Sequence, residues 1–185
     1  MSKFFFASDL HGDLCATDAI LRRFEAEDAE RLILLGDLLY HGPRNELPDA
    51  YAPKKVIERL SAYRDRILAV RGNCDTEVDQ MVLPFPILAD YALLYADGFS
   101  MFLTHGHHAS MDNPPALAKG DCLISGHTHV AALKPFGDSH LYLNPGSPSI
   151  PKEGTVPSYL IYERGSFSLR DLSGKEYASC LWKTV

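Results

Sequence analysis

The first 70 residues alternate between short apolar segments and segments with helical periodicity, and this alternation restricts the fold more than any other feature. Three apolar segments have the length and composition of buried strands: residues 4–8, 31–35 and 67–70. Between them, Asp13 can cap a helix over residues 14–26, and residues 54–63 carry apolar side chains at helical spacing. Repeats of strand, helix and strand predict right-handed crossovers and a mostly parallel sheet.

The second half of the chain carries hairpin signals instead. Three pairs of strand-like segments are joined by turns that contain glycine: 91–95 with 99–104, 131–136 with 139–143, and 158–163 with 166–172. Residues 121–125 form a further buried strand, and residues 177–182 are a candidate for the last one. A parallel α/β half followed by a hairpin-rich half predicts two sheets stacked face to face, with helices outside, in a single domain of residues 1–185.

Composition excludes several classes of protein. Hydrophobic residues make up 46% of the chain and charged residues 23%, which are values of an ordinary globular domain rather than a disordered chain or a coiled coil. The net charge is 18 − 24 = −6, which argues against a nucleic-acid binder. No segment approaches the ~20 apolar residues of a membrane span. The four scattered cysteines and the lack of a signal-peptide pattern predict a cytoplasmic protein that does not bind membranes.

Five apolar strands are followed directly by Asp, His or Asn, usually beside a glycine. These segments are Ser-Asp-Leu-His-Gly at 8–12, Leu-Gly-Asp at 35–37, Arg-Gly-Asn-Cys-Asp at 71–75, Leu-Thr-His-Gly-His at 103–107 and Gly-His-Thr-His at 126–129. Functional groups collect at the carboxyl ends of strands in open α/β sheets, so five such ends should converge on one cleft. In an extended backbone, residues two apart share a face. We therefore expect Asp9 to point the same way as His11, and His127 the same way as His129.

The polar side chains at these strand ends predict a metal site with two ions. They are Asp9, His11, Asp37, Asn73, His105, His127 and His129. Mixed nitrogen and oxygen donors without thiolate suit divalent ions such as Mn²⁺, Fe²⁺ or Zn²⁺. Seven ligands are too many for one ion with an open position, but they fit two ions that share Asp37, because its two carboxylate oxygens can bridge. A pair of divalent ions generates hydroxide at neutral pH, so phosphate-ester hydrolysis is the expected reaction.

Each of these residues also has an ordinary explanation when it is taken alone. An Asp after a strand is usually a turn residue or a helix cap, and a lone His is usually a surface or core residue. Five strand ends that hold four of the eight histidines favour a shared site. Two divalent ions with two carboxylates and a bridging hydroxide carry a charge of about +1, which a diester monoanion neutralises. This count weakly favours diesters over monoesters.

The motifs D-x-H, G-D, G-N, H before G, and G-H-x-H resemble the signature of the calcineurin-like metallophosphoesterase superfamily, over residues 4 to about 150. Residues 6–12, 41–45, 69–75 and 144–147 are similar to its small bacterial phosphodiesterases of the YfcE type. The resemblance implies a four-layer α/β/β/α sandwich, with two stacked mixed β-sheets flanked by helices. It also implies hydrolysis of small phosphodiesters by a hydroxide that two metal ions activate.

The resemblance further implies which residues serve each ion. One ion would take Asp9, His11, Asp37 and His129, and the other would take Asp37, Asn73, His105 and His127. The expected ions are two Mn²⁺, with Fe²⁺, Zn²⁺ or Ni²⁺ as other candidates. Asp37, Asn73 and His105 are the expected catalytic residues. The loop after Asp37 supplies the candidate substrate-binding residues His41, Arg44 and Asn45.

The chain departs from the wider superfamily at Cys74. Many members have His at this position, and that His protonates the leaving group. A thiol with a pKa of ~8.5 is a poor substitute for imidazole as an acid, so we expect a bias toward activated leaving groups such as aryl esters. Cys74 is also a candidate packing residue. The next residue, Asp75, is expected to orient Asn73 or a neighbouring histidine.

Three other functions compete with a phosphodiesterase. A phosphomonoesterase of the same fold remains open. A nuclease would need a basic groove, and the chain has no cluster of Lys and Arg. A non-catalytic scaffold, like the retromer subunit related to this fold, is disfavoured because every ligand position holds a competent residue. The expected partner is a small phosphodiester, and apolar edges after residue 156 leave a homo-oligomer open.

Overall fold

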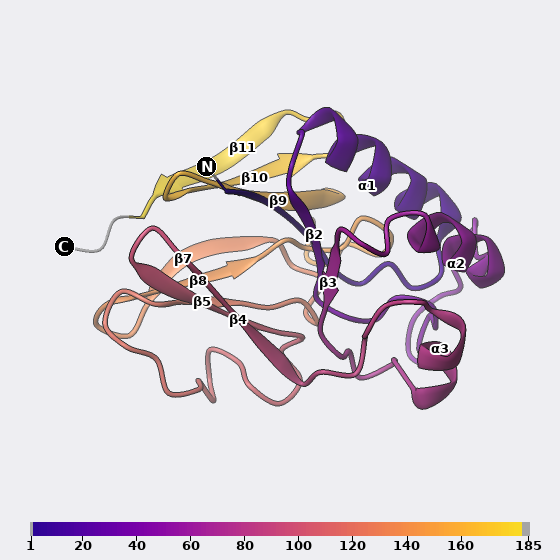
Figure 1. Cartoon of the computed structure of the whole chain (residues 1–185), viewed down its shortest axis with the longest axis horizontal. Coiled ribbons are helices and arrows are strands. Elements are labelled where there is room, and N and C mark those ends of the chain that lie inside the picture. Colours follow the sequence, from indigo (N-terminus) through magenta and orange to yellow (C-terminus); the bar gives the residue numbers. More distant parts are fainter. Residues whose placement is uncertain (1, 183–185) are drawn as a thin grey trace.

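The computed structural model describes residues 2–182 of the 185-residue chain, and these residues form two β-sheets and three helices (Figure 1). The helices are α1 (Leu14–Ala26), α2 (Pro53–Ser61) and α3 (Glu77–Val82). The strands are β1 (Lys3–Ala7), β2 (Arg31–Leu34), β3 (Ile67–Ala69), β4 (Tyr91–Ala96), β5 (Phe99–Thr104), β6 (Cys122–Ile124), β7 (Ala132–Phe136), β8 (His140–Asn144), β9 (Ser158–Glu163), β10 (Ser166–Asp171) and β11 (Glu176–Leu181).

The two sheets are both mixed. The first has the order β11-β10-β9-β1-β2-β3, in which β1, β2 and β3 are parallel and β9 is antiparallel to β1. The second has the order β4-β5-β6-β8-β7, with a parallel centre and antiparallel edge strands. The prediction of two stacked mixed sheets flanked by helices is therefore confirmed, and the expected strands agree with the observed ones within two residues.

Alternate residues of the central strands face two different apolar cores. On β1, Phe5 packs toward the helices with Ile20 and Phe24 of α1. The next residue, Phe6, packs between the sheets with residues such as Met101. All of these side chains are fully buried, and each contributes ~1.5–3 kcal/mol by leaving water. Burial on both faces explains why these strands are continuous apolar runs rather than alternating ones.

The helices are concentrated beside the six-stranded sheet. The side chain of Asp13 accepts a hydrogen bond from the backbone N–H of Ala16 (3.0 Å), so it caps α1 as predicted. The short α3 lies beside α2 at one end of the sandwich and was not expected from the sequence (Figure 1). Among the described residues, the segment 105–121 that follows β5 contains no helix. No helix in the described part of the chain combines the length and the apolar composition that a bilayer crossing requires.

Candidate metal centre

The loops after β1, β2, β3, β5 and β6 meet at the carboxyl ends of their strands. Backbone hydrogen bonds join neighbouring loops: Asp9 donates to the carbonyl of Gly36 (3.0 Å), and His11 donates to that of Asp37 (2.9 Å). The loops after β5 and β6 are joined in the same way, by a bond from Gly126 to the carbonyl of His105 (2.9 Å). The structure thus brings all seven predicted ligand side chains to one end of the sandwich.

The backbone at five of these residues is left-handed. The φ angles are 58° at Asp9, 49° at His11, 56° at Asp37, 67° at His127 and 61° at His129. The expectation that Asp9 and His11, and likewise His127 and His129, share a face through extended backbone was therefore wrong. Each such residue costs ~1–2 kcal/mol, and strain of this kind gathers at functional sites. The chain turns sharply after each strand, and the turns aim the side chains inward.

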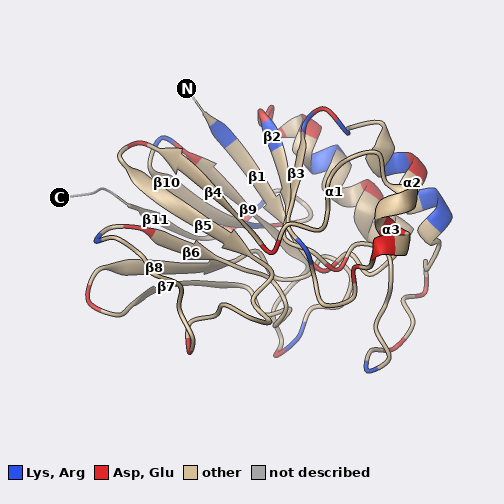
Figure 2. Ribbon diagram, turned by 60° about the horizontal axis from the view of Figure 1, so that its bottom comes forward, with Lys and Arg blue, Asp and Glu red and all other residues tan. Residues whose placement is uncertain are grey.

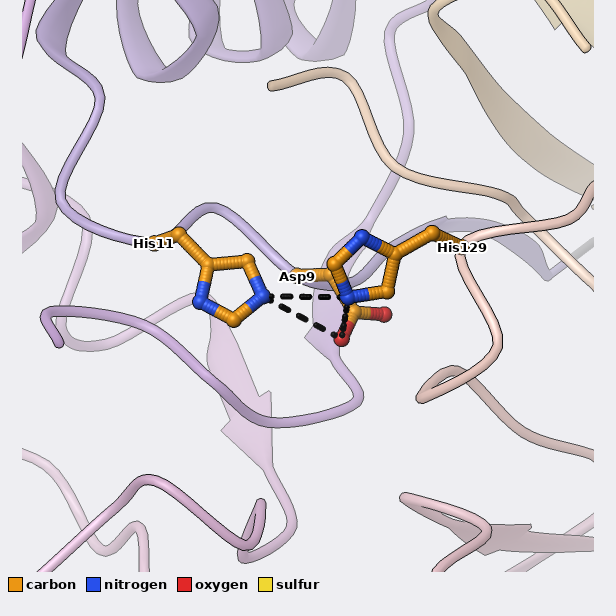
Figure 3. A group of neighbouring side chains, drawn as sticks. All are labelled: Asp9, His11 and His129. Atoms are coloured by element: carbon orange, nitrogen blue, oxygen red, sulfur yellow. Dashed lines mark hydrogen bonds and ion pairs between the residues drawn. The ribbon is translucent and has the colours of Figure 1, made fainter. Parts of the chain in front are cut away.

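Asp9, His11 and His129 form the first of two clusters of metal-ligand atoms (Figure 3). Asp9 Oδ1 lies 3.3 Å from His129 Nε2 and 3.7 Å from His11 Nε2, and the two Nε2 atoms are 3.1 Å apart. The Nδ1 atoms of His11 and His129 lie 2.8 and 2.7 Å from the carbonyls of Tyr40 and Ile150, and each donates its proton there. Since Nδ1 carries the donated proton, the neutral form of each ring points an Nε2 lone pair toward the same carboxylate oxygen. Burial opposes protonation of His11, but Asp9 raises its pKa.

When both rings are neutral, no proton lies between these nitrogen and oxygen acceptors. Asp9 Oδ1 is buried and has no hydrogen-bond partner in the described part of the chain. Buried acceptors that face one another are unfavourable unless a proton or a cation lies between them. The cluster therefore fits a bound cation.

The second cluster surrounds His105. Its Nε2 lies 3.0 Å from Asn73 Oδ1, 3.2 Å from His127 Nδ1 and 3.4 Å from Asp37 Oδ2. Its Nδ1 lies 2.7 Å from the carbonyl of Leu35, which fixes the ring in the same way as in the first cluster. These donors, two imidazoles with an amide and a carboxylate oxygen, again suit a borderline or hard divalent ion.

Asp37 lies between the two clusters. Its Oδ2 is 3.8 Å from His11 Nε2 in the first cluster and 3.4 Å from His105 Nε2 in the second. Its Oδ1 accepts a hydrogen bond from the backbone N–H of Cys74 (2.8 Å), which holds the carboxylate in this position. One carboxylate thus faces both sets of nitrogen donors, as a bridging ligand must.

Asp75 holds the backbone on both sides of this bridge. Its Oδ2 accepts from the N–H groups of Asp37 and Gly72 (2.8 Å each), and its Oδ1 accepts from Leu38 (2.9 Å). The prediction that Asp75 orients Asn73 or a histidine was wrong, because the backbone of these loops occupies both oxygens. Burial raises the pKa of Asp75 despite these bonds. Gly72 packs so closely on Asp37 that a Cβ would collide with it.

Charges within the site keep its carboxylates ionised. Burial alone would raise the pKa of Asp9 and Asp37, but the adjacent histidine side chains lower the pKa of both carboxyl groups below the ordinary 3.8. Burial opposes protonation of His105, yet Asp37 and Asp9 raise its pKa to about 9. His105 without a metal therefore retains a proton at neutral pH. A divalent ion would replace that proton, since metal ligation requires the neutral ring.

A cavity of about 420 Å³ opens over the second cluster and the bridge. Its lining includes Asp37, Asn73, His127 and His129 from the metal centre, together with Arg44, Asn45, Cys74, Thr128 and Lys152. Two of the three predicted substrate-binding residues, Arg44 and Asn45, thus face the cavity. Thr128 and Lys152 were not predicted. Lys152 is tied to the centre by its backbone N–H, which donates to the carbonyl of His129 (3.1 Å), and no sequence motif marks it.

His41 does not line this cavity. Its ring packs edge-on against Tyr40 (4.8 Å between centroids) and Tyr51 (5.4 Å). Its carbonyl accepts a hydrogen bond from Asn45 Nδ2 (2.7 Å). The contacts of His41 therefore make it a support of the loop that carries Arg44 and Asn45.

Cys74 lines the cavity with a thiol that stays protonated. Burial, reinforced by the charge of Asp37, raises its pKa to about 12. Its sulfur lies in a group with His11 and Asp37 whose ligand atoms are within 4.8 Å of one another, and it accepts a hydrogen bond from Asn73 Nδ2 (3.3 Å). With such a pKa, the thiol is both a weaker acid than imidazole and a poor source of thiolate for a metal.

The chain belongs to the calcineurin-like phosphoesterase superfamily, whose domain model matches residues 3–166. The resemblance read from the strand-end motifs is therefore confirmed. The chain is 50% identical to the phosphodiesterase YfcE of Escherichia coli K12 over 159 residues, which is 86% of each chain. Its structure matches that of the E. coli phosphoesterase YfcE with a TM-score of 0.95 and 44% identity, over 98% of this chain and 100% of that one.

More distant proteins match this chain in sequence or in structure. The phosphodiesterase MJ0936 of Methanocaldococcus jannaschii is 28% identical over 147 residues, which cover 75% of this chain and 80% of that protein. Vacuolar protein sorting 29 of Cryptosporidium parvum matches with a TM-score of 0.65 at 17% identity, over 99% of this chain and 98% of that one. At such low identity the second match shows a common fold alone.

Proposed function

We propose that this chain is a metal-dependent phosphodiesterase that hydrolyses small phosphodiesters. The observation that carries the proposal is the position of Asp37, which faces two clusters of candidate metal-ligand side chains beside one open cavity. A bound pair of divalent ions supplies a hydroxide nucleophile at neutral pH and neutralises phosphate charge. The similarity to YfcE and MJ0936, both named phosphodiesterases, supports the same activity.

The proposed ligand sets follow the two clusters. Asp9, His11, Asp37 and His129 would hold one ion, and Asp37, Asn73, His105 and His127 would hold the other. Mn²⁺ is our candidate for both positions, because the donors are imidazole and oxygen, without thiolate. Asp37, Asn73 and His105 are the proposed catalytic residues, since they lie at or beside the bridge and the cavity.

Cationic side chains of the cavity would bind the substrate phosphate. Arg44 reaches the cavity from the loop after β2, and its planar guanidinium suits two phosphate oxygens at once. Lys152 enters from the loop that supports His129 and adds a second positive charge. Figure 2 shows Lys and Arg spread over helices and loops rather than along one continuous stripe, which supports a small substrate over a nucleic acid.

We further propose that the chain forms a single domain and that it is located in the cytoplasm. The match to the family domain over residues 3–166 supports one domain. The four cysteines, Cys15, Cys74, Cys122 and Cys180, are free thiols, as in proteins of a reducing compartment.

Hydrolysis of a diester and a monoester by the same preparation tests the function. Protein loaded with Mn²⁺ should cleave bis(4-nitrophenyl) phosphate faster than 4-nitrophenyl phosphate, and a chelator should abolish both reactions. Asp37→Asn should lower kcat/KM by at least ~100-fold, because it removes the bridging charge. Asp90→Asn, an exposed Asp outside the site, is the matched control. Faster cleavage of the monoester would assign the chain as a phosphomonoesterase, and an Asp37→Asn variant with unchanged rates would refute both assignments.

A further inference from the structure

A second cavity, of about 430 Å³, adjoins the first at Cys74. Cys74 contributes to the lining of both cavities, so they are neighbours at this residue. The second cavity is walled mainly by apolar and aromatic side chains: Tyr40, Tyr51, Ile57, Val78 and Val82. The metal centre and the phosphate-binding cations face only the first cavity. The proposed function leaves this second space without an assigned role.

The aromatic wall of the second cavity is anchored to a loop of the metal centre. Tyr40 follows β2, and its carbonyl accepts the hydrogen bond from His11 Nδ1 (2.8 Å). Tyr51 packs on Gly12, the residue after His11, where its ring occupies the space that a side chain would need. The backbone N–H of Ala52 also donates to the carbonyl of Gly12 (2.9 Å). The wall therefore keeps a fixed position relative to the metal ligands.

Other lining residues of the second cavity expose apolar side chains to solvent. Val78 of α3 is 68% exposed and Val82 is 48% exposed, although neither contributes to a core. Tyr40, which lines the same cavity, is 42% exposed. The charged residues in the lining, Lys54 and Asp79, have opposite signs, so the cavity does not select for a net charge. Exposed apolar residues that line a hollow are typical of a binding site for an apolar group.

We propose that the second cavity binds an aromatic ester group of the substrate while the phosphate lies at the metal centre. The inference rests on the proposed function and specifies its substrate class: diesters in which at least one ester group is a flat aromatic ring. A phosphodiester carries two ester groups, and one directed past Cys74 enters the second cavity. The ring of Tyr40 and the branched side chains of α3, which line this cavity, then contact the aromatic group. A dialkyl ester of small size would leave this space unfilled.

Calorimetric titration of Mn²⁺-loaded protein with diphenyl phosphate and dimethyl phosphate tests this substrate class. Both probes are monoanionic diesters, so they differ only in the groups that the second cavity would take. Diphenyl phosphate should bind at least about tenfold more tightly, which corresponds to ~1.4 kcal/mol. Equal affinities, or no measurable binding of diphenyl phosphate, would overturn the proposal.

Two double variants test whether the second cavity causes the preference for diphenyl phosphate over dimethyl phosphate. Val78→Ser with Val82→Ser removes apolar surface from the cavity without adding charge, and it should reduce the ratio of the two affinities to about threefold or less. Leu93→Ser with Tyr95→Ser removes exposed apolar side chains of β4, which are 60% and 75% exposed and do not line either cavity; this control should keep the wild-type ratio. A serine variant of α3 that keeps the full preference would refute the site.

These measurements separate the subsite from the activity. If the protein prefers diphenyl phosphate but hydrolyses no aryl diester, the proposed function fails and the subsite stands. If it hydrolyses aryl diesters and binds both probes equally, the function stands and the subsite fails.

Discussion

Replacement of Asp75 by Asn tests whether the backbone around the bridging carboxylate is held in place by charge. Three backbone N–H groups converge on the carboxylate of Asp75, two on Oδ2 and one on Oδ1. An amide has the same shape but only one acceptor oxygen. If that oxygen takes the Oδ2 position, the bonds from Asp37 and Gly72 remain and the amide NH₂ faces the N–H of Leu38. The opposite orientation loses two bonds, so the first is favoured.

The expected loss follows from this geometry. One hydrogen bond to a charged acceptor disappears, and one buried N–H is left facing another donor. We therefore expect the free energy of unfolding to fall by ~2–4 kcal/mol. Because Asp37 is positioned through these bonds, the affinity for Mn²⁺ should fall ~10–100-fold, as for other groups that orient metal ligands.

Urea unfolding of the metal-free protein at pH 7 measures the first effect, and calorimetric titration with Mn²⁺ measures the second. Asp138→Asn, an exposed residue in the turn between β7 and β8, should change neither quantity. A loss of stability below ~0.5 kcal/mol together with wild-type Mn²⁺ affinity would show that the three bonds do not position the bridge.

Two further predictions concern the leaving group and acid stability. Across aryl diesters whose leaving phenols rise in pKa, kcat/KM should fall steeply, because the Cys74 thiol with a pKa of about 12 is a poor proton donor; a flat profile would contradict this. Burial opposes ionisation of Glu27, but Tyr159, Arg23 and Arg170 lower its pKa from 4.5 to about 2. A lowered carboxyl pKa stabilises the fold above pH 4.5, and the effect disappears as the pH falls toward 2. Glu27→Gln should therefore lower the free energy of unfolding by ~1–2 kcal/mol at pH 7, after allowance for solvent around the arginines, and by much less near pH 2. Urea unfolding at pH 7 and near pH 2 measures this loss of stability. An equal loss at both pH values would show that the lowered pKa of Glu27 does not stabilise the fold.

Local signals were sufficient for most of the fold. The helix over residues 14–26 was predicted with its observed bounds, because Asp13 caps it and apolar residues recur on one face. The strand Ser158–Glu163 was likewise bounded by turn residues. The helix α3 was missed because none of its side chains is buried, so it has no apolar periodicity. Its available signal was the capping box, in which Thr76 and Asp79 bond each other's backbone N–H groups.

The candidate site was likewise predictable from the sequence in part. Residue type and strand-end position were enough to group the seven predicted ligands, because parallel strands deliver their carboxyl ends to one edge. The left-handed backbone at Asp9 was not predictable, since distant contacts impose it: its N–H donates to Gly36, and its carbonyl accepts from Ser147, 138 residues away. Lys152 enters the cavity through a similar long-range contact with the loop of His129. Local sequence carries no signal for such contacts.

The left-handed backbone and the facing lone pairs of the metal centre have one explanation: the fold holds the ligand side chains in place before an ion binds. Within residues 2–182, the five left-handed residues of the metal centre and the buried Oδ1 of Asp9, which has no hydrogen-bond partner there, are unfavourable without a metal. Backbone hydrogen bonds among the loops hold these groups in place nonetheless, and the Nδ1 atoms of His11, His105 and His129 are each fixed by a backbone carbonyl. The unfavourable free energy of arranging the metal-ligand side chains is therefore already part of the free energy of folding. A bound cation would relieve the repulsion among these side chains, and the folding of this domain would then be thermodynamically linked to its affinity for divalent ions.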